Sequence, residues 1–383
     1  MSIETLEILQ PGLLTTVQDA GRYGHQRYGV PVSGAMDLFS LRAANLLVGN
    51  DQGEACLEMT AIGPKARFLS DVYISITGGD LAPVLNDEPL AQWCCVRVTK
   101  DSVLSFRGPR DGMRSYLAIA GGIDVPEVLG SRSTYVKSAI GGIEGRAIAV
   151  GDVLSRAERS RPEPEERGLP DTLEPPTYGR RHEIRVVLGP QAEAFTENGI
   201  ATLLGSEYSI AADSDRMGYR LDGPTVEHVS NADIVSDGTP LGAVQVPGDG
   251  QPIILLADRG TAGGYAKVAT LIGPDVSRLG QAMPGDTLTF KSVTVEEAHS
   301  ILREQEDILL AIAVESGSAS SPGDLTIIVD GDAFRFDAEA GEATPAPNGP
   351  GGTPGQTRKV RATMDGEEHE FEVRVGEDGS QRP

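Results

Sequence analysis

Short apolar segments, each closed by glycine, proline or aspartate, recur along most of the chain. Several are rich in β-branched residues that alternate with polar positions, a period typical of strands rather than helices. In the first half the predicted strands cover residues 3–10, 72–80, 94–98, 103–108, 115–123 and 147–154. In the second half they lie within residues 183–195, 208–210, 241–247, 251–258, 267–273 and 285–290. The pattern therefore predicts a mainly β protein.

Three segments interrupt this pattern with helical spacing. Residues 35–50 repeat apolar positions three and four apart, and we expect Ser33 to cap the N-terminus of this helix and Gly49 to end it. A short helix is expected within residues 274–286, and a longer one over residues 294–316. The predicted fold class is thus a pair of strand-built lobes with a few short helices.

Composition divides the chain into two lobes and a tail. Residues 1–160 form the predicted N-terminal β lobe, residues 161–182 a proline-rich and charged linker, and residues 183–313 the C-terminal β lobe with its terminal helix. Residues 314–383 form a separate appendage with linker-like and low-complexity sequence. Within it we predict a β-hairpin around the Asp365–Gly366 turn.

Charge and composition narrow the function classes. The 383 residues include 33 lysines and arginines against 56 aspartates and glutamates, a net charge of −23 that would repel nucleic acid and anionic membranes. The three cysteines are too few for a disulfide framework, and the five histidines lack metal-ligand spacing, so no metal is predicted on this chain. No leader and no apolar run near ~18 residues is apparent, so we expect a cytoplasmic protein.

Familiar catalytic motifs are absent from the sequence. There is no G-x-x-x-x-G-K-[ST] phosphate loop, since the glycines and the lysine of "GTAGGYAK" (260–267) have the wrong separation. There is no G-x-S-x-G nucleophile motif either, so covalent catalysis by this chain is not expected. What remains is a set of fixed polar groups in loops.

Three glycine-rich segments, residues 15–37, 215–223 and 258–270, carry most of these polar groups. The candidate catalytic residues are Asp37, Arg216, Gln245, Asp258 and Lys267. The candidate substrate-binding residues are Gln18, Asp19, Arg22, Asn45, Asp215, Gly263, Gly264 and Tyr265. Cations brought together at one end of a barrel would polarise a carbonyl group and balance a carboxylate. We therefore predict that these segments converge on a single electropositive cavity.

Each group also has a structural alternative. Asp19 and Arg22 would pair across a turn, and Gln245 would be a buried amide with its hydrogen bonds made. The charges of residues 215–222 would form a solvated network that contributes little energy, and Lys267 would be solvated. The sequence leaves these alternatives open.

The glycine-rich segments resemble the signature blocks of a known family. "TTVQDAGRYGHQRYGVPVSGAMDLFSLRAANLLVGN", "DRMGYRLDG" and "GAVQVPGDGQPIILLADRGTAGGYAK" are similar to blocks of the biotin-dependent carboxyltransferase family, over residues 3–298. The matching motif positions are Gln18, Asp19, Gly21, Arg22, Gly34, Asp37, Asn45, Asp215, Arg216, Met217, Gly218, Gln245, Gly250, Asp258, Thr261, Gly263, Gly264, Tyr265 and Lys267. The resemblance implies two cyclophilin-like β-barrel lobes and a partner, the B-type subunit, that completes the active site.

Members of this family include the C-type subunit of 5-oxoprolinase and part of urea carboxylase, so the resemblance implies two reactions. In the first, ATP activates the lactam of 5-oxoproline, and water opens it to glutamate in a complex with the A-type and B-type subunits. For this reaction our hypothesis is that Arg22 or Arg216 binds the carboxylate or phosphate of the substrate. Asp37 or Asp258 would then carry the proton.

The developing negative charge would be stabilised by the remaining candidates. These are Lys267, Gln245 and the backbone N–H groups near Gly263 and Gly264. In the second reaction, which the resemblance equally implies, the same donors would polarise the ureido carbonyl of carboxybiotin. The substrate is in either case a small polar molecule with a carboxylate or a urea-like group.

The tail bears on the choice between the two reactions. Residues 358–375 resemble the strand pair that precedes the biotinyl module of some biotin enzymes, but no biotinylated-lysine motif follows them. Either a separate partner protein would carry biotin, or the strand pair is a remnant of a biotinyl module. A third alternative is a non-catalytic protein that sequesters a kinase inhibitor, as one family member does, and its partner would again be a homologue of the B-type subunit.

Overall fold

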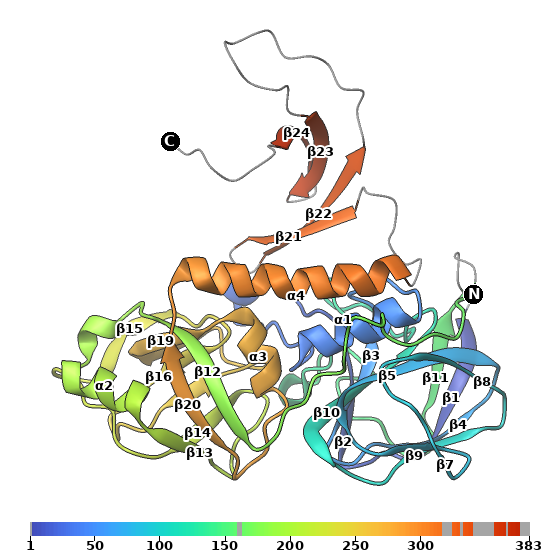
Figure 1. Ribbon diagram of the computed structural model, residues 1–383, viewed down its shortest axis with the longest axis horizontal. Coiled ribbons are helices and arrows are strands. Elements are labelled where there is room, and N and C mark those ends of the chain that lie inside the picture. Colours follow the sequence, from blue (N-terminus) through green and yellow to red (C-terminus); the bar gives the residue numbers. More distant parts are fainter. Residues whose placement is uncertain are drawn as a thin grey trace. The chain divides into compact units, whose positions relative to one another are not determined.

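The computed structural model describes residues 2–158 and 163–315, together with the backbone of four strands within residues 324–375. The chain divides into two compact units, Met1–Ser318 and Ala319–Pro383. The first unit is mainly β with a few helices, as predicted. Figure 1 shows its two strand-built lobes, with α1 (Leu38–Leu47) and α3 (Gly273–Leu279) between them.

Two antiparallel sheets build the first lobe. The larger sheet contains, in spatial order, β11 (Val153–Ala157), β1 (Ser2–Gln10), β4 (Lys65–Phe68), β9 (Val103–Phe106), β6 (Pro83–Leu85) and β7 (Glu88–Pro89). The smaller sheet contains β2 (Leu14–Gln18), β3 (Cys56–Thr60), β10 (Asp111–Ile119), β5 (Val72–Asp80) and β8 (Cys95–Val98). Both contribute to one core, through residues such as Ile8 and Phe68 from the larger sheet and Leu57 and Ile74 from the smaller. The lobe is therefore two sheets over a shared core, and the barrel that we expected here is not closed by hydrogen bonds.

The second lobe is a closed barrel of seven strands. In order around the barrel these are β12 (Arg181–Leu188), β19 (Lys267–Leu271), β16 (Ala243–Gln245), β17 (Ile253–Leu255), β14 (Gly218–Asp222), β13 (Glu207–Ile210) and β20 (Thr287–Ser292). The barrel closes where β20 pairs in parallel with β12. Strand β12 alternates as a half-buried strand should, with His182, Ile184 and Val186 facing inward. A separate two-stranded sheet, β15 (Asp233–Gly238) and β18 (Ala262–Tyr265), accompanies the barrel.

The helices connect the lobes. The long helix α4 (Val295–Glu315) contacts both α1 and α3, and Figure 1 shows it running along one side of the two lobes. The barrel lobe also contains α2 (Glu197–Gly205), which the sequence pattern missed. Single 3-10 turns are η1 (Gln26–Tyr28), η2 (Val136–Ser138) and η3 (Ala192–Ala194). No described helix combines the length and the apolar surface needed to span a lipid bilayer.

The start of α1 differs from the prediction. Ser33 was expected to be the N-cap, but the helix begins at Leu38, and Asp37 caps it by accepting a hydrogen bond from the backbone of Ser40 at 3.0 Å. Ser33 has a positive φ of 55° and points elsewhere. The predicted stop is confirmed, since Gly49 follows the helix with a φ of 70°.

Two other segments add detail to the prediction. Only the end of residues 147–154 is a strand, because Asp152 accepts hydrogen bonds from Arg146 at 2.7 Å and from the backbone of Ala149 at 2.7 Å, which closes a turn before β11. The predicted linker, residues 161–182, contains residues that pack against the lobes. Leu169 and Leu173 lie on a small core with Trp93.

The second unit is a four-stranded antiparallel sheet. Its strands are β21 (Asp324–Val329), β22 (Asp332–Glu339), β23 (Gln356–Met364) and β24 (Glu367–Val375), in that spatial order. The predicted hairpin is β23 paired with β24. The low-complexity sequence between β22 and β23 lies outside the described residues.

Candidate active site

The predicted convergence of the loops occurs at the junction of the two lobes. The segment 19–37 of the first lobe lies against the segment after β17 of the barrel. Ser33 donates its backbone N–H to the Ala257 carbonyl at 3.1 Å and its hydroxyl to Asp258 Oδ1 at 2.8 Å. The left-handed backbone of Ser33 allows both bonds, so residues 225 positions apart in the sequence hold the two lobes together.

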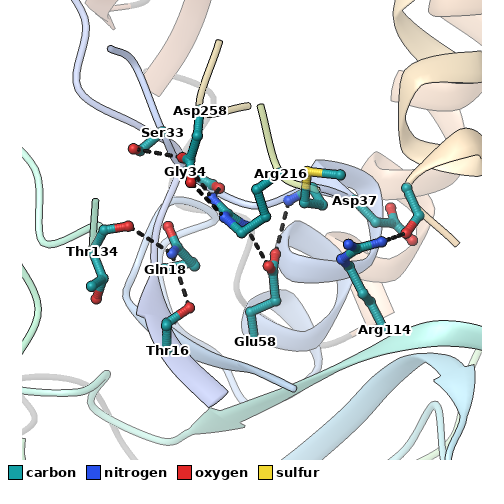
Figure 2. A network of polar contacts seen from close by, with 12 residues as sticks. Thr16, Gln18, Ser33, Gly34, Asp37, Glu58, Arg114, Thr134, Arg216 and Asp258 are labelled. Atoms are coloured by element: carbon teal, nitrogen blue, oxygen red, sulfur yellow. Dashed lines mark hydrogen bonds and ion pairs between the residues drawn. The ribbon is translucent and has the colours of Figure 1, made fainter. Parts of the chain in front are cut away.

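Arg216 is the centre of this junction, as Figure 2 shows. Its Nε and Nη2 donate to the carboxylate of Asp258 at 2.9 and 3.1 Å, and Nη2 also donates to the Gly34 carbonyl at 2.7 Å. Its Nη1 donates to Glu58 Oε1. Burial by itself lowers the pKa of Arg216, but the carboxylates of Asp258 and Glu58 outweigh burial and raise it, so the guanidinium stays charged.

Glu58 is a buried partner that our sequence analysis missed. Its Oε2 accepts hydrogen bonds from the Met36 backbone and from the Tyr116 hydroxyl, both at 2.8 Å, and the Tyr116 oxygen accepts from the Asp37 backbone at 2.8 Å. The sequence feature that could have revealed Glu58 is a carboxylate inside the apolar segment "CLEMT", which forms a strand with every residue buried. Because a lone buried carboxylate is costly, such a residue implies a cation from elsewhere in the fold.

Asp37, a predicted proton carrier, lies within the same junction. Besides capping α1, it accepts hydrogen bonds from the Ser40 hydroxyl at 2.6 Å and from Gln281 Nε2 at 2.7 Å. Burial raises the pKa of Asp37, and the bonds from Ser40 and Gln281 oppose this rise. The side chain is 1% exposed, and its visible function is structural.

A second set of contacts crosses between the lobes beside Asp37. Gln281, which follows α3, accepts the backbone N–H groups of Met113 and Arg114 at 3.1 and 2.9 Å. Arg114 in turn donates to the Tyr219 hydroxyl of the barrel at 2.7 Å. These buried side chains were not among the sequence candidates, because neither stands in a glycine-rich loop.

Three predicted substrate-binding residues form hydrogen bonds inside the first lobe. Asp19 accepts from Gly21 and from the hydroxyls of Ser131 and Ser133, while Arg22 donates to the carbonyls of Val128 and Ser133, each at 2.8 Å. Burial lowers the pKa of Arg22, although the charge of Asp19 opposes it. Gln18 donates to Thr16 and Thr134, each at 3.0 Å. Arg22 Nη1 has no hydrogen-bond partner in the described part of the chain, but the residue is 0% exposed, so its guanidinium is not accessible to a substrate carboxylate in this structure.

Two further candidates have local partners. Asn45 donates to the Glu54 carbonyl at 2.8 Å and accepts from Asn50 at 3.0 Å, so it ties α1 to the following loop. Asp215 is exposed and pairs with Lys137 of the first lobe at 3.1 Å. Such an exposed ion pair contributes little energy.

The remaining candidates gather at one end of the barrel. Gln245 of β16 lies opposite Lys267 of β19, and its Nε2 donates to the Tyr265 carbonyl at 3.2 Å. Lys267 is 1% exposed and donates to Asp237 at 3.1 Å, whereas the Asp237 side chain is 57% exposed. A Cβ on Gly263 would stand only 2.6 Å from Gln245 Nε2, so this glycine lets β18 approach the amide closely. Gly264 and Tyr265 complete the cluster in β18.

The cations of the three segments do not line an open cavity, contrary to our prediction. Arg22, Arg216 and Lys267 are 0%, 8% and 1% exposed, respectively, and each is bonded to protein oxygens. A cavity of about 240 Å³ is lined by Asp80, Arg107 and Arg110 among others, and a second of about 160 Å³ by Arg220 and its neighbours. Within the described residues no cluster of histidine, cysteine, aspartate or glutamate is arranged to hold a metal.

Two strand-built subdomains joined by a buried arginine–carboxylate network, with polar groups on glycine-rich barrel loops, define the class of protein. The sequence profile described as carboxyltransferase domain, subdomain A and B, matches residues 28–292. The chain belongs to this carboxyltransferase family, which confirms the resemblance of its sequence blocks.

Curated relatives include two that are named as the C-type subunit of 5-oxoprolinase. The one from Escherichia coli is 38% identical over 79% of this chain and 95% of its own length, and the one from Haemophilus influenzae is 35% identical with the same coverage. The urea amidolyase of Saccharomyces cerevisiae is 35% identical over 80% of this chain, but the chain spans only 17% of that protein.

Solved structures support the same relationships. The protein TTHA0988 superposes with a TM-score of 0.69 and 35% identity over 76% of this chain and 56% of that chain. The Kluyveromyces lactis urea amidolyase superposes with a TM-score of 0.77 and 30% identity over 94% of this chain and 23% of that chain. The chain thus spans about half of the first protein and about a quarter of the second.

Proposed function

We propose that this chain is the C-type subunit of an ATP-dependent 5-oxoprolinase, a hydrolase that opens the cyclic amide of 5-oxoproline to glutamate together with partner subunits of the A and B types. One observation carries the proposal: 301 aligned residues cover 95% of the corresponding Escherichia coli 5-oxoprolinase subunit at 38% identity. The match to urea amidolyase covers 17% of that protein. The higher identity and the near full-length coverage of that relative favour the function of the 5-oxoprolinase subunit over that of urea amidolyase.

The barrel cluster supports a role in stabilising charge. When water attacks the activated lactam carbon, negative charge develops on oxygen, and fixed donors lower the energy of that transition state. Lys267, Gln245 and the backbone of Gly263 lie next to one another and are supplied by three strands. Asp258 is poorly placed to carry the proton, because both of its carboxylate oxygens already accept hydrogen bonds from Arg216 and Ser33.

Reconstitution of the complex tests this function. The chain is purified with homologues of the A-type and B-type subunits, and glutamate formation from 5-oxoproline is measured with and without ATP. We expect turnover that requires ATP and all three proteins and that avidin does not change. Absence of glutamate from the complete mixture contradicts the proposal.

One observation favours carboxyl transfer from biotin as a second candidate. The first unit holds 318 of the 383 residues, yet the urea amidolyase structure covers 94% of the chain, which extends the likeness into the second unit. The aligned 5-oxoprolinase relatives cover 79%. The second function predicts activity that requires urea and a biotin carrier instead of 5-oxoproline. It also predicts that avidin abolishes this activity.

A further inference from the structure

Arg259 is adjacent to Asp258 in the chain but lies outside the network of Arg216. Its Nε donates to the Thr239 carbonyl at 2.7 Å and its Nη1 to the Leu256 carbonyl at 3.4 Å. Nη2 makes no hydrogen bond to any described residue, and no described carboxylate lies within 4.0 Å of the guanidinium. Since Asp258 is already bound to Arg216 and Ser33, the nearest carboxylate in sequence is not available to it.

Other partly buried or paired arginines of the barrel lobe have a counter-ion within the described part of the chain, which Arg259 lacks. Arg185 pairs with Asp275 at 2.6 Å, and Arg180 pairs with Asp286 at 2.8 Å. Arg259 is half-buried, and burial lowers its pKa to about 10, with Tyr23 opposing the change. A partly desolvated cation without a carboxylate gains free energy when an anion binds beside it.

A second polar group, Tyr23, belongs to the segment of the other lobe that lies beside Arg259. The Arg22 backbone N–H donates to the Val32 carbonyl at 2.7 Å and Ser33 bonds to Ala257 and Asp258, so the loop that carries Tyr23 lies against the segment that carries Arg259. Burial raises the pKa of Tyr23, and the charge of Arg259 opposes that rise. The Tyr23 hydroxyl makes no hydrogen bond to the described part of the chain. Arg259 and Tyr23 thus present free donors from the barrel and from the first lobe.

This pair is continuous with the barrel cluster. Thr239 accepts the hydrogen bond from Arg259, and its methyl group would stand 3.1 Å from a Cβ on Gly263. Gly263 in turn lies against Gln245. A small molecule bound to Arg259 at this edge would therefore have its other end near the donors that we assign to charge stabilisation.

We propose that Arg259 and Tyr23 bind the carboxylate of the substrate, the role that the sequence analysis assigns to Arg22 or Arg216. The inference rests on the proposed function, because 5-oxoproline carries one carboxylate beside its lactam. A guanidinium holds a carboxylate through charge-assisted hydrogen bonds, and the phenol adds one more donor. Arg216 is occupied by Asp258, Glu58 and the Gly34 carbonyl, and Arg22 is completely buried, so neither guanidinium is accessible to a ligand in this structure.

Substrate discrimination tests the assignment in the reconstituted complex. For Arg259→Gln we expect KM for 5-oxoproline to rise roughly ten- to a hundredfold, the usual loss for a hydrogen-bonded charge. For 2-pyrrolidinone, which has the lactam but no carboxylate, the variant and the wild type should behave alike. Tyr23→Phe should show a smaller rise, and Arg97→Gln, an exposed arginine of the first lobe, none. An unchanged KM for 5-oxoproline in Arg259→Gln overturns the assignment.

A chemical measurement separates this assignment from the proposed function. Phenylglyoxal modifies accessible arginines, and peptide mass spectrometry of the full chain reports the modified residue. We expect Arg259 to react and 5-oxoproline, but not 2-pyrrolidinone, to protect it. Protection without any turnover would refute the 5-oxoprolinase function and retain the carboxylate site. Modification that 5-oxoproline does not slow refutes the site, whatever the turnover.

Discussion

Asp258 and Arg259 are neighbours in the chain but belong to two different polar environments. Asp258 is 7% exposed, and its carboxylate receives two hydrogen bonds from Arg216 and one from Ser33. Arg259 has two carbonyl partners and no described carboxylate beside it. The first environment is saturated by the protein, and the second leaves a charge for a ligand.

The difference teaches how to separate structural charge from functional charge. A buried ion pair with complete hydrogen bonds holds segments in place. Removal of one member leaves the other as an unpaired charge in a nonpolar interior, which is strongly destabilising. A half-buried cation without a partner keeps part of its binding capacity. Arg216 therefore positions the junction, whereas Arg259, the residue after Asp258, keeps a donor without a protein partner in the described part of the chain.

Loss of Arg216 should have the largest effect. In Arg216→Met the carboxylates of Glu58 and Asp258 remain buried without their cation, so we expect the free energy of unfolding to fall by ~3–5 kcal/mol. Urea denaturation measures this change. Arg97→Met, which breaks an exposed pair with Asp71, is the control and should cost less than ~1 kcal/mol.

If Arg216→Met does not fold, Glu58→Gln supplies the same test with one charge removed and the shape kept. It should destabilise the chain less than Arg216→Met. A cost below ~1 kcal/mol for both variants would show that the junction is not the structural element described above.

Lys267→Met should show the opposite pattern, a loss of turnover with little loss of stability. Methionine keeps the apolar stem of the side chain, and the partner carboxylate of Asp237 is already largely in water. We expect kcat for 5-oxoproline to fall roughly ten- to a thousandfold, as for removal of a donor that stabilises transition-state charge. Steady-state kinetics and urea denaturation on the same preparation compare the two losses. Unchanged kcat would return Lys267 to a structural role.

Two glycines of β18 sharpen the comparison within the barrel loops. In Gly263→Ala the new methyl group would lie 2.6 Å from Gln245 Nε2, so the amide must move, at a cost of ~1–3 kcal/mol. In Gly264→Ala the nearest atoms are 3.8 Å away, which makes it the matched control. We expect lower kcat and a lower midpoint of urea denaturation for Gly263→Ala only. Equal behaviour of the two variants would mean that the position of Gln245 is unimportant.

His182 allows a test of a buried group away from the junction, with the smallest expected effect. It lies 3.4 Å from Asp286, and burial lowers its pKa below the ordinary value of 6.5, although Asp286 opposes the change. The unfolded chain therefore binds the proton more readily, so stability present above pH 6.5 is lost as the pH falls toward the folded pKa. Urea midpoints between about pH 7.5 and about pH 5 should fall less in His182→Gln. A parallel fall in both proteins would contradict this.

Much of the fold followed from local pattern. The strand predicted at 72–80 is β5, and the helix predicted at 294–316 is α4, because both carry a sustained period with clear end signals. The cap at Ser33 was wrong because a tertiary bond to Asp258 recruits that side chain. The short helix α2 was missed since its nine residues offer little periodic signal.

The candidate site was predicted less completely than the fold. The loops around Gly34, Arg216 and Asp258 do meet, as their polar composition suggested. Glu58 was missed because a single charge in an apolar strand carries no information about its distant partner, 158 positions away. The environment of Arg22 was not predicted, because a cation in a glycine-rich loop has the same appearance in the sequence whether its donors face backbone carbonyls or a ligand.

The sequence by itself determined the strand-rich class, the acidic character and the blocks that mark the carboxyltransferase family. Only the tertiary structure decided which charged side chains are neutralised inside the protein and which remain available. The reason is that hydrogen bonds and ion pairs form over about 3 Å in space. The partners in this protein lie tens to hundreds of residues apart in the sequence. A local sequence pattern therefore does not indicate whether a charged residue such as Arg259 has a counter-ion.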